Sequence, residues 1–357
     1  MEKVPPFHLT EWSQVDGWDQ PKQDFLYAFN VFRDSCRVLK QRSPWQTVCA
    51  RAEETEPVRQ EEARGFFEEH FDPHQVRNDD GTTEGLMTGY FAPDLVGDRQ
   101  PSQRFRHPLY RAPEDLLTIE LGELRPEFKE LRLRGRVEGK KVLPYWSRAQ
   151  IDGPQQPLKG QELFWVEDPV ELFFLHIQGS GRIVLENGEK IMVGYADQNG
   201  HPFRSIGKLL IDSGEMSRDQ MSMQNIQAWA RRNPDKARRL LDENPSYIFF
   251  AELPTAFWTP PGALGLPLTP HRSLAVDRRV IPLGAPVMVS TTWPNSDYPL
   301  KNLMFAHDTG GAINGAVRGD FFWGMGNDAG RFAGRMKQKC YFWVLLPKEL
   351  ANPNDWR

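Results

Sequence analysis

The chain begins with residues patterned for helices. Between residues 23 and 70, apolar positions recur at three- and four-residue spacing in QDFLYAFNVFRDSCRVLKQR, PWQTVCARAEE and EEARGFFEEHF. This spacing predicts amphipathic helices. The pair Asp72-Pro73 predicts that the third helix ends there.

From Glu84 onward the pattern changes to short apolar or alternating runs bounded by glycine and proline, which predicts strands. In chain order these runs are GLMTGYFAP, HPLYRAP, FFLHIQGSGRIVL, EKIMVGYAD, NPSYIFFAE, RSLAVDRRVIPLGAPVMVST, LMFAHDTG and KCYFWVLLP. Helices are predicted at SIGKLLIDSG and over residues 217–244, with a break at Asn233-Pro234. The charge-dense stretch from Glu120 to Lys141 predicts a solvated helix or a surface connection. Together these elements predict a mainly β protein with α segments, of the α+β class.

Composition adds three limits to this picture. The length of 357 residues favours two domains, and a net charge of -4 argues against a nucleic-acid partner. Neither a membrane-spanning run nor a signal-like start is visible, which predicts a soluble chain but leaves its compartment open. Cys36 and Cys49 would pair in an exported protein and would otherwise be buried thiols.

Candidate chemistry concentrates in the glycine-rich stretch from His307 to Gly334. Asp308 lies in FAHDTGG and Asp320 in RGDFFWG, and a third aspartate, Asp277, lies in AVDRRVIPLG. Apolar neighbours desolvate a carboxyl and raise its pKa, which suits a general acid. The alternative is that each aspartate caps a turn.

The aromatic run that follows Asp320 suits a carbohydrate ligand. Phe321, Phe322 and Trp323 offer faces on which a sugar ring can stack, although such residues in a β protein also fill cores. HExxH and GxSxG motifs are absent from the sequence, and Pro73 separates His70 from His74 so that both are expected at the surface. We therefore expect neither a metal nor a cofactor.

The three aspartate segments, together with FFLHIQGSGRI, GYADQNGHPFRSIGKLLI, SMQNIQAW and NPSYIFF, closely resemble the lytic murein transglycosylase A family. The resemblance runs in order from TGYFAP at residue 88 to the tryptophan of YFWVLLP at residue 343. It implies a double-psi β-barrel with a second β domain inserted into it and a groove between them. The barrel would comprise residues 1–93, including the helical N-terminal segment, and residues 258–357. The inserted domain would comprise residues 94–257.

Enzymes of this family cleave the β-1,4 bond between N-acetylmuramic acid and N-acetylglucosamine in peptidoglycan and leave a 1,6-anhydro-muramoyl end. Carried over by motif, Asp320 corresponds to the catalytic acid/base, and Asp308 and Asp277 correspond to its companion aspartates. A single acid/base suffices because the C6 hydroxyl of the substrate is the nucleophile. Six further residues are weaker candidates for glycan contacts: Thr309, Gly311, Tyr90, Gln178, Ser180 and Arg204.

Two other functions fit the same residues. Asp308 and Asp320 could be the pair of an inverting glycoside hydrolase, or the chain could be a glycan-binding protein without activity. The resemblance also implies export to the periplasmic face of the outer membrane, with a lipid anchor in the precursor. Its expected partners are peptidoglycan glycan strands and other cell-wall enzymes, and we expect a monomer.

Overall fold

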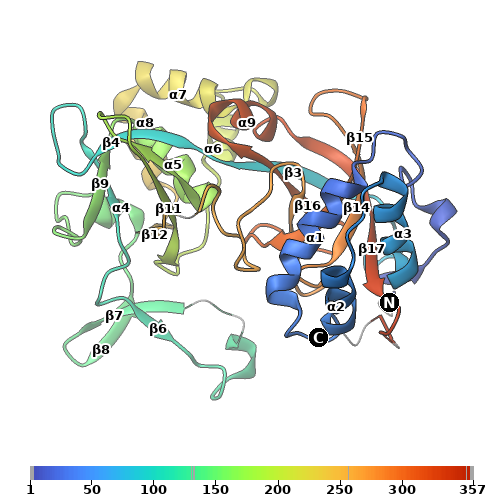
Figure 1. Cartoon of the computed structure of the whole chain (residues 1–357). Helices are drawn as coiled ribbons and strands as arrows, with labels where there is room; N and C mark the ends of the chain where they lie inside the picture. Colours follow the sequence, from blue (N-terminus) through green and yellow to red (C-terminus); the bar gives the residue numbers. More distant parts are fainter. Residues whose placement is uncertain (1–3, 130, 132, 256, 351, 354–357) are drawn as a thin grey trace. The chain divides into compact units, whose positions relative to one another are not determined.

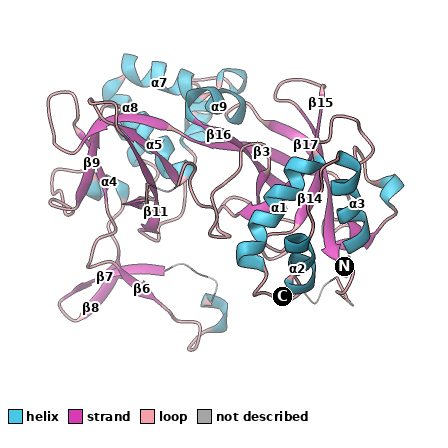
Figure 2. Cartoon of the chain, viewed as in Figure 1, coloured by secondary structure: helices cyan, strands magenta, loops and turns pink. Residues whose placement is uncertain are grey.

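The chain folds into two units in the computed structural model, which describes residues 4–129, 131, 133–255, 257–350 and 352–353 (Figure 1). Unit 1 comprises Met1–Phe91 and Pro261–Arg357, and unit 2 comprises Ala92–Pro260. Strands dominate the centre of each unit, and helices are packed on the strands (Figure 2). Within the described part of the chain, none of the helices is long and apolar enough to cross a membrane.

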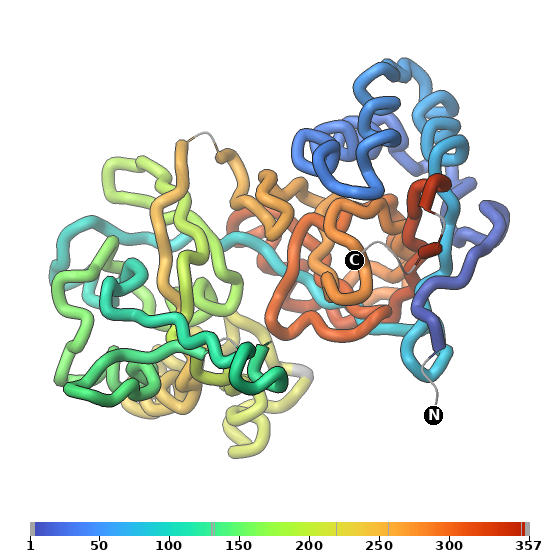
Figure 3. Tube along the Cα trace, turned by 90° about the horizontal axis from the view of Figure 1, so that it is seen from below, coloured from blue at the N-terminus to red at the C-terminus, as the bar shows by residue number. Residues whose placement is uncertain are grey.

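Unit 1 begins with short elements and three helices that match the predicted N-terminal segment. They are β1 (Phe7–Leu9), a 3-10 turn (Trp12–Gln14), α1 (Phe25–Leu39), α2 (Gln46–Glu54) and α3 (Gln60–His70). The three helices lie together on one side of the strands of this unit (Figures 1 and 3). Helix α1 begins at Asp24, whose carboxylate accepts the amide of Tyr27 at 3.0 Å. Cys36 and Cys49 form a disulfide that joins α1 to α2.

One eight-stranded sheet forms the rest of unit 1, in the order β1-β2-β17-β14-β15-β13-β16-β3. Its further strands are β2 (Phe71–Val76), β3 (Gly85–Ala92), β13 (Ser273–Val276), β14 (Pro286–Thr292), β15 (Pro299–Asp308), β16 (Arg318–Met325) and β17 (Lys337–Pro347). Helix α9 (Gly326–Ala333) follows β16 directly.

Strand β17 closes six of these strands into a barrel. Residues 337–340 of β17 pair with β3, and residues 341–344 pair with β14. The ring therefore runs β17-β14-β15-β13-β16-β3 and returns to β17. Within the ring, β13 lies between β15 on one side and β16 on the other.

Apolar side chains from α1, α3, β2 and β15 form a shared core, in which Phe32 of α1 lies edge-to-face with Phe67 of α3. Phe32 packs edge-to-face on Phe71, with ring centroids 5.5 Å apart, and stacks with Phe305 of β15 at 6.4 Å. All four rings are fully buried. Burial of each such ring contributes about 2 kcal/mol, so the N-terminal helices are fixed against the barrel wall. His74, expected at the surface, is instead buried on β2, because it lies inside a strand that pairs with β17 on one side and β1 on the other.

Unit 2 is built on a six-stranded sheet in the order β12-β11-β10-β4-β9-β5. Its strands are β4 (Asp94–Asp98), β5 (His107–Tyr110), β9 (Glu162–Val166), β10 (Ser180–Val184), β11 (Lys190–Gln198) and β12 (Ile248–Glu252). A bridge between Arg111 and Phe250 links the two edges of this sheet. The helices of the unit are α4 (Arg148–Ile151), α5 (Pro169–Gln178), α6 (Ile206–Asp212), α7 (Met223–Arg232) and α8 (Pro234–Asp242), with a 3-10 turn at Arg218–Gln220.

One sequence-based prediction in unit 2 was wrong, and a second was right only in part. The run FFLHIQ is the end of helix α5 and not a strand, because Asp168 caps the helix N-terminus and Gly179 ends it in a left-handed conformation. The charge-dense stretch from Glu120 to Lys141 is mostly exposed, as expected of a surface connection, but among its described residues it contains strands and no long helix. A 3-10 turn (Pro126–Phe128) precedes β7 (Leu133–Glu138), which pairs with β6 (Leu117–Ile119) and β8 (Lys141–Pro144).

Candidate active site

The register of three barrel strands places the two aspartates of the glycine-rich stretch on either side of one small residue. Ala275 of β13 is the register partner of Asp308 on β15 and of Asp320 on β16. The strands that carry the two aspartates therefore lie on either side of this alanine. Each of them is about 4.8 Å from β13, the usual distance between neighbouring strands. The side chain of Ala275 is small and buried, which leaves room for both carboxyls.

In the described part of the chain, the hydrogen-bond donor to Asp320 is the hydroxyl of Thr88 on β3. The Thr88 hydroxyl donates to Oδ1 of Asp320 at 2.7 Å, while the Arg318 guanidinium donates to the oxygen of Thr88 at 2.9 Å. Because the Arg318 bond occupies an acceptor position of the hydroxyl, its hydrogen is directed at Asp320. Oδ2 of Asp320 is thus the oxygen available to hold a proton.

Asp308 accepts three hydrogen bonds. The backbone amides of Thr309 and Ala263 each donate to Oδ1 at 2.9 Å, and the Tyr90 hydroxyl donates to Oδ2 at 3.1 Å. The Tyr90 ring lies 5.1 Å from the ring of Phe322, which holds it over the barrel strands. All three donors stabilise the ionised form of Asp308.

Burial raises the pKa of both carboxyls, Asp308 and Asp320, to about 6. For Asp308, burial is opposed by the amides of Thr309 and Ala263 and by Tyr90. For Asp320, burial is opposed by Thr88 and the charge of Arg318, and the charge of Asp308 raises its pKa further. Asp308 thus has more donors for its ionised form, and the charge of Asp308 favours the protonated form of Asp320.

Asp277 lies in a different environment, because it is paired with a cation. Arg279 donates from Nε to Oδ1 at 2.9 Å and from a terminal nitrogen to Oδ2 at 2.8 Å. The amide of Gly315 also donates to Oδ2, at 2.9 Å. Burial would raise the pKa of Asp277, but these donors outweigh it and lower the pKa below its usual value. Asp277 is therefore an ionised anchor for the loop that connects β15 to β16.

The other predicted contact residues fall in both units. Thr309 follows Asp308 and contributes its amide, and Gly311 lies exposed in the next loop, where its carbonyl accepts from Asn314. In unit 2, Gln178 ends α5 and Ser180 begins β10, on either side of Gly179. Arg204 is exposed and forms an ion pair with Glu243 at 2.6 Å.

Sequence reasoning did not identify Thr88, Arg318 or the amide of Ala263 as partners of the aspartates. Thr88 precedes Tyr90 by two residues and Arg318 precedes Asp320 by two, so each pair shares one face of a strand. The two-residue spacing could have indicated that Thr88 and Arg318 face the same way as Tyr90 and Asp320. It does not indicate that β3 pairs with β16. Within the described residues, no group of three His, Cys, Asp or Glu side chains is placed to hold a metal ion.

Comparison with known proteins relates the chain to one family. The model of the MltA specific insert domain matches residues 86–251, and the model of the 3D domain matches residues 272–346. The chain is 33% identical to the membrane-bound lytic murein transglycosylase A of Escherichia coli K12 over 282 residues, covering 77% of this chain and 69% of the relative.

Two solved structures are also similar to the chain. MltA from Neisseria gonorrhoeae, in a monoclinic form, superposes with a TM-score of 0.85 at 40% identity, covering 98% of this chain and 97% of the other. Escherichia coli MltA with bound chitohexaose superposes with a TM-score of 0.71 at 26% identity, covering 97% and 96%.

Proposed function

The chain belongs to the membrane-bound lytic murein transglycosylase A family, and from that premise we propose that it is a lytic transglycosylase that cleaves peptidoglycan. The observation that carries the proposal is the pair of carboxyls on either side of Ala275. Among the described residues, one has three donors and the other has one. Such a pair favours one ionised and one protonated carboxyl near pH 6.

Asp320 acts as the acid and then as the base. Its protonated carboxyl donates to the glycosidic oxygen as the bond between N-acetylmuramic acid and N-acetylglucosamine breaks. The resulting carboxylate then takes the proton of the muramoyl C6 hydroxyl as that oxygen attacks C1 of its own ring. The products are a free N-acetylglucosamine end and a 1,6-anhydro-muramoyl end, and water is not consumed. Because the attack is intramolecular, one acid/base residue suffices.

Asp308 supports this reaction through its charge. An ionised Asp308 disfavours ionisation of Asp320 and so keeps its proton in place before cleavage. It also stabilises positive charge that develops on the sugar ring in the oxocarbenium-like state. Asp277, bound to Arg279 and to the amide of Gly315, keeps the loop between β15 and β16 in shape.

A glycan strand is the proposed ligand, as in the relative solved with chitohexaose. In unit 1, Tyr90, Thr309 and Gly311 lie on or beside the site, and their positions support glycan contacts. For unit 2 we propose contacts from Gln178, Ser180 and Arg204. Exchange of Arg204 for alanine, with its ion-pair partner Glu243 exchanged as a control, tests whether that residue affects KM for murein.

We also propose a fold type for unit 1 and a cellular location for the protein. The closed ring of six strands in unit 1 supports a double-psi barrel, in which two strand connections cross. The name of the relatives, membrane-bound lytic murein transglycosylase A, supports a cell-envelope location. We propose the periplasmic face of the outer membrane, with a lipid anchor in the precursor, and fractionation of cells that express the whole gene tests this.

Exchange of Asp320 for asparagine tests the central role. The variant should lose cleavage by about 10³-fold or more, since an amide cannot donate and regain the proton, while murein binding stays. Burial disfavours the ionised Asp320 carboxyl, so the amide should melt at the same temperature or higher at about pH 8. A stable variant with an unchanged cleavage rate would exclude Asp320 as the acid/base.

A further inference from the structure

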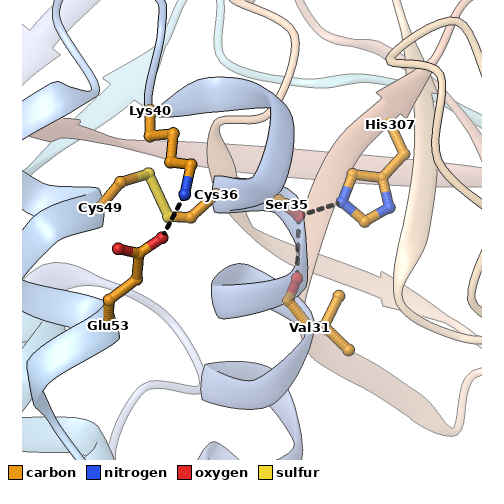
Figure 4. Close-up of a disulfide and its surroundings, with 7 residues drawn as sticks. All are labelled: Val31, Ser35, Cys36, Lys40, Cys49, Glu53 and His307. Carbon is orange, nitrogen blue, oxygen red and sulfur yellow. Dashed lines mark hydrogen bonds and ion pairs between the residues drawn. A yellow bond between two sulfur atoms is a disulfide. The ribbon is translucent and has the colours of Figure 1, made fainter.

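His307 precedes Asp308 on β15 and its imidazole faces the opposite way. Successive strand residues point to opposite faces, so the Asp308 carboxyl lies in the site and the His307 ring lies toward α1. Figure 4 shows the His307 ring directed at Ser35 of that helix. The side chain is 2% exposed, and the proposed mechanism has not used it.

Both nitrogens of the His307 ring are hydrogen-bonded to buried serines. Nε2 lies 2.8 Å from the Ser35 hydroxyl, and Nδ1 lies 2.8 Å from the Ser273 hydroxyl. Ser35 donates its hydrogen to the Val31 carbonyl at 2.8 Å, so Nε2–H must donate to Ser35. Nδ1 therefore accepts from Ser273. Burial lowers the pKa of His307 to about 4, so the ring is neutral and this arrangement persists at neutral pH.

This Ser35–His307–Ser273 chain of hydrogen bonds joins three elements around the site. Ser35 belongs to α1, His307 to β15, and Ser273 is the first residue of β13. Strand β13 carries Ala275, which lies between the two aspartates. The imidazole thus fixes the position of β15, which carries Asp308, against β13.

The backbone of His307 also holds the loop that donates to Asp308. The His307 carbonyl accepts the amide of Leu264 at 2.9 Å, and the neighbouring Ala263 donates its amide to Asp308. The loop approaches so closely that a Cβ on Gly262 would lie 2.5 Å from the His307 carbonyl oxygen. A shift of His307 would therefore move both the Asp308 carboxyl and one of its donors.

The disulfide restrains the C-terminal part of α1, which carries Ser35. Cys36 follows Ser35 directly and is bonded to Cys49 of α2 (Figure 4). Both sulfur-bearing residues are fully buried. The cross-link restrains the last turns of α1, and with them the Ser35 hydroxyl, at the distance that the imidazole needs.

From these contacts we propose that His307 is a positioning residue for Asp308, held by Ser35 and Ser273. The inference rests on the proposed function, because it assigns His307 to the reaction that Asp308 supports. Its distinguishing consequence is an effect on turnover and on the titration of the pair, with little effect on glycan binding.

His307→Leu removes both ring contacts at similar volume, and the test measures steady-state kinetics on murein across pH. We expect kcat to fall by about 10²-fold, the loss typical of a misplaced catalytic group, with KM within about twofold. The acid limb of the pH profile should move to higher pH, because a displaced Asp308 loses its amide donor and its pKa rises further. His307→Gln, which still donates to Ser35, should recover part of kcat.

His74→Asn is the matched control, since His74 is a comparably buried histidine on β2, outside the closed ring of strands. It should leave the pH profile unchanged even if the melting temperature falls. Ser273→Ala provides a milder second variant, with the same direction of change, if His307→Leu does not fold.

Failure of the proposed function and failure of the positioning role give different results. Wild-type protein that releases no anhydro product would contradict the proposed function. If the wild-type protein is active and both His307→Leu and Ser273→Ala match it in kcat and in both limbs of the pH profile, only the positioning role is overturned. A loss of kcat with unmoved limbs, like a loss of stability alone, would overturn it as well.

Discussion

Asp308 and Asp320 differ as residues through their donors and not through their sequence context. Each lies beside an apolar run in glycine-rich sequence, Asp308 after one and Asp320 before one, and burial raises the pKa of each to about 6. Two amides and the Tyr90 hydroxyl donate to Asp308, whereas Asp320 has the Thr88 hydroxyl. The larger number of donors favours the ionised form of Asp308, and the charge of Asp308 favours the protonated form of Asp320.

This difference predicts a bell-shaped pH dependence of kcat/KM. Asp308 must be ionised, so activity is lost as pH falls below about 6 and the carboxylate takes up a proton. Asp320 must be protonated, so activity is also lost as pH rises above about 6. The maximum should lie near pH 6, measured as initial rates on soluble murein fragments. A rate that keeps rising to about pH 9 would contradict a protonated acid.

Strand β13 is the element on which the spacing of the two carboxyls depends. Paired residues of antiparallel strands share a face, so a larger side chain at Ala275 would occupy the space beside Asp320. Ala275→Leu should lower kcat by about tenfold or more and cost about 1–3 kcal/mol through overpacking. Ala285→Leu, at another fully buried alanine of unit 1, is the control for overpacking alone. Equal rates for the two variants would remove the register argument.

The disulfide between α1 and α2 makes a prediction about stability. Exchange of both Cys36 and Cys49 for alanine opens a loop whose ends are 13 residues apart. The free energy of unfolding should fall by about 3 kcal/mol, measured by urea denaturation. Cys340, the free and buried cysteine among the described residues, supplies the control, because Cys340→Ala opens no loop. A double variant as stable as the wild type would show that packing alone holds α1.

Helices and strands could be predicted where the spacing of apolar residues was clear. The prediction failed where packing on two faces removed that spacing. Helices α1 to α3 bury one face each, so their spacing was visible in the sequence. Helix α5 instead packs on the sheet through Leu172 and Leu175 and on α7 and α8 through Val170 and Phe173. A helix that is apolar on two faces resembles a buried strand. The caps Asp168 and Gly179 would have resolved it.

The candidate site was predictable by residue but not by geometry. The aspartates stood out because glycine and aromatic residues surround them in the sequence. Thr88 and Arg318 did not stand out, since their roles depend on the pairing of β3 with β16. These two strands lie more than 200 positions apart in the sequence. His307 was hidden for the same reason, because Ser35 reaches it from 272 positions away.

At the scale of the whole molecule, the site is built from two segments of unit 1 that are separated in the sequence by unit 2. Unit 2 is inserted between β3 and β13, so Thr88 and Tyr90 come from the segment before it. Asp308 and Asp320 come from the segment after it. The proton-holding pair is complete only when β3 has joined the ring beside β16 and β17.

The most direct test of the central claim is the chemical nature of the product. Purified protein is incubated with intact murein, and the released muropeptides are weighed by mass spectrometry. Transfer to the C6 hydroxyl predicts anhydro-muramoyl ends, lighter than reducing ends by one water molecule, and none from Asp320→Asn. Reducing ends alone would mean that water is the nucleophile, as in a glycoside hydrolase, and would contradict transfer to the C6 hydroxyl.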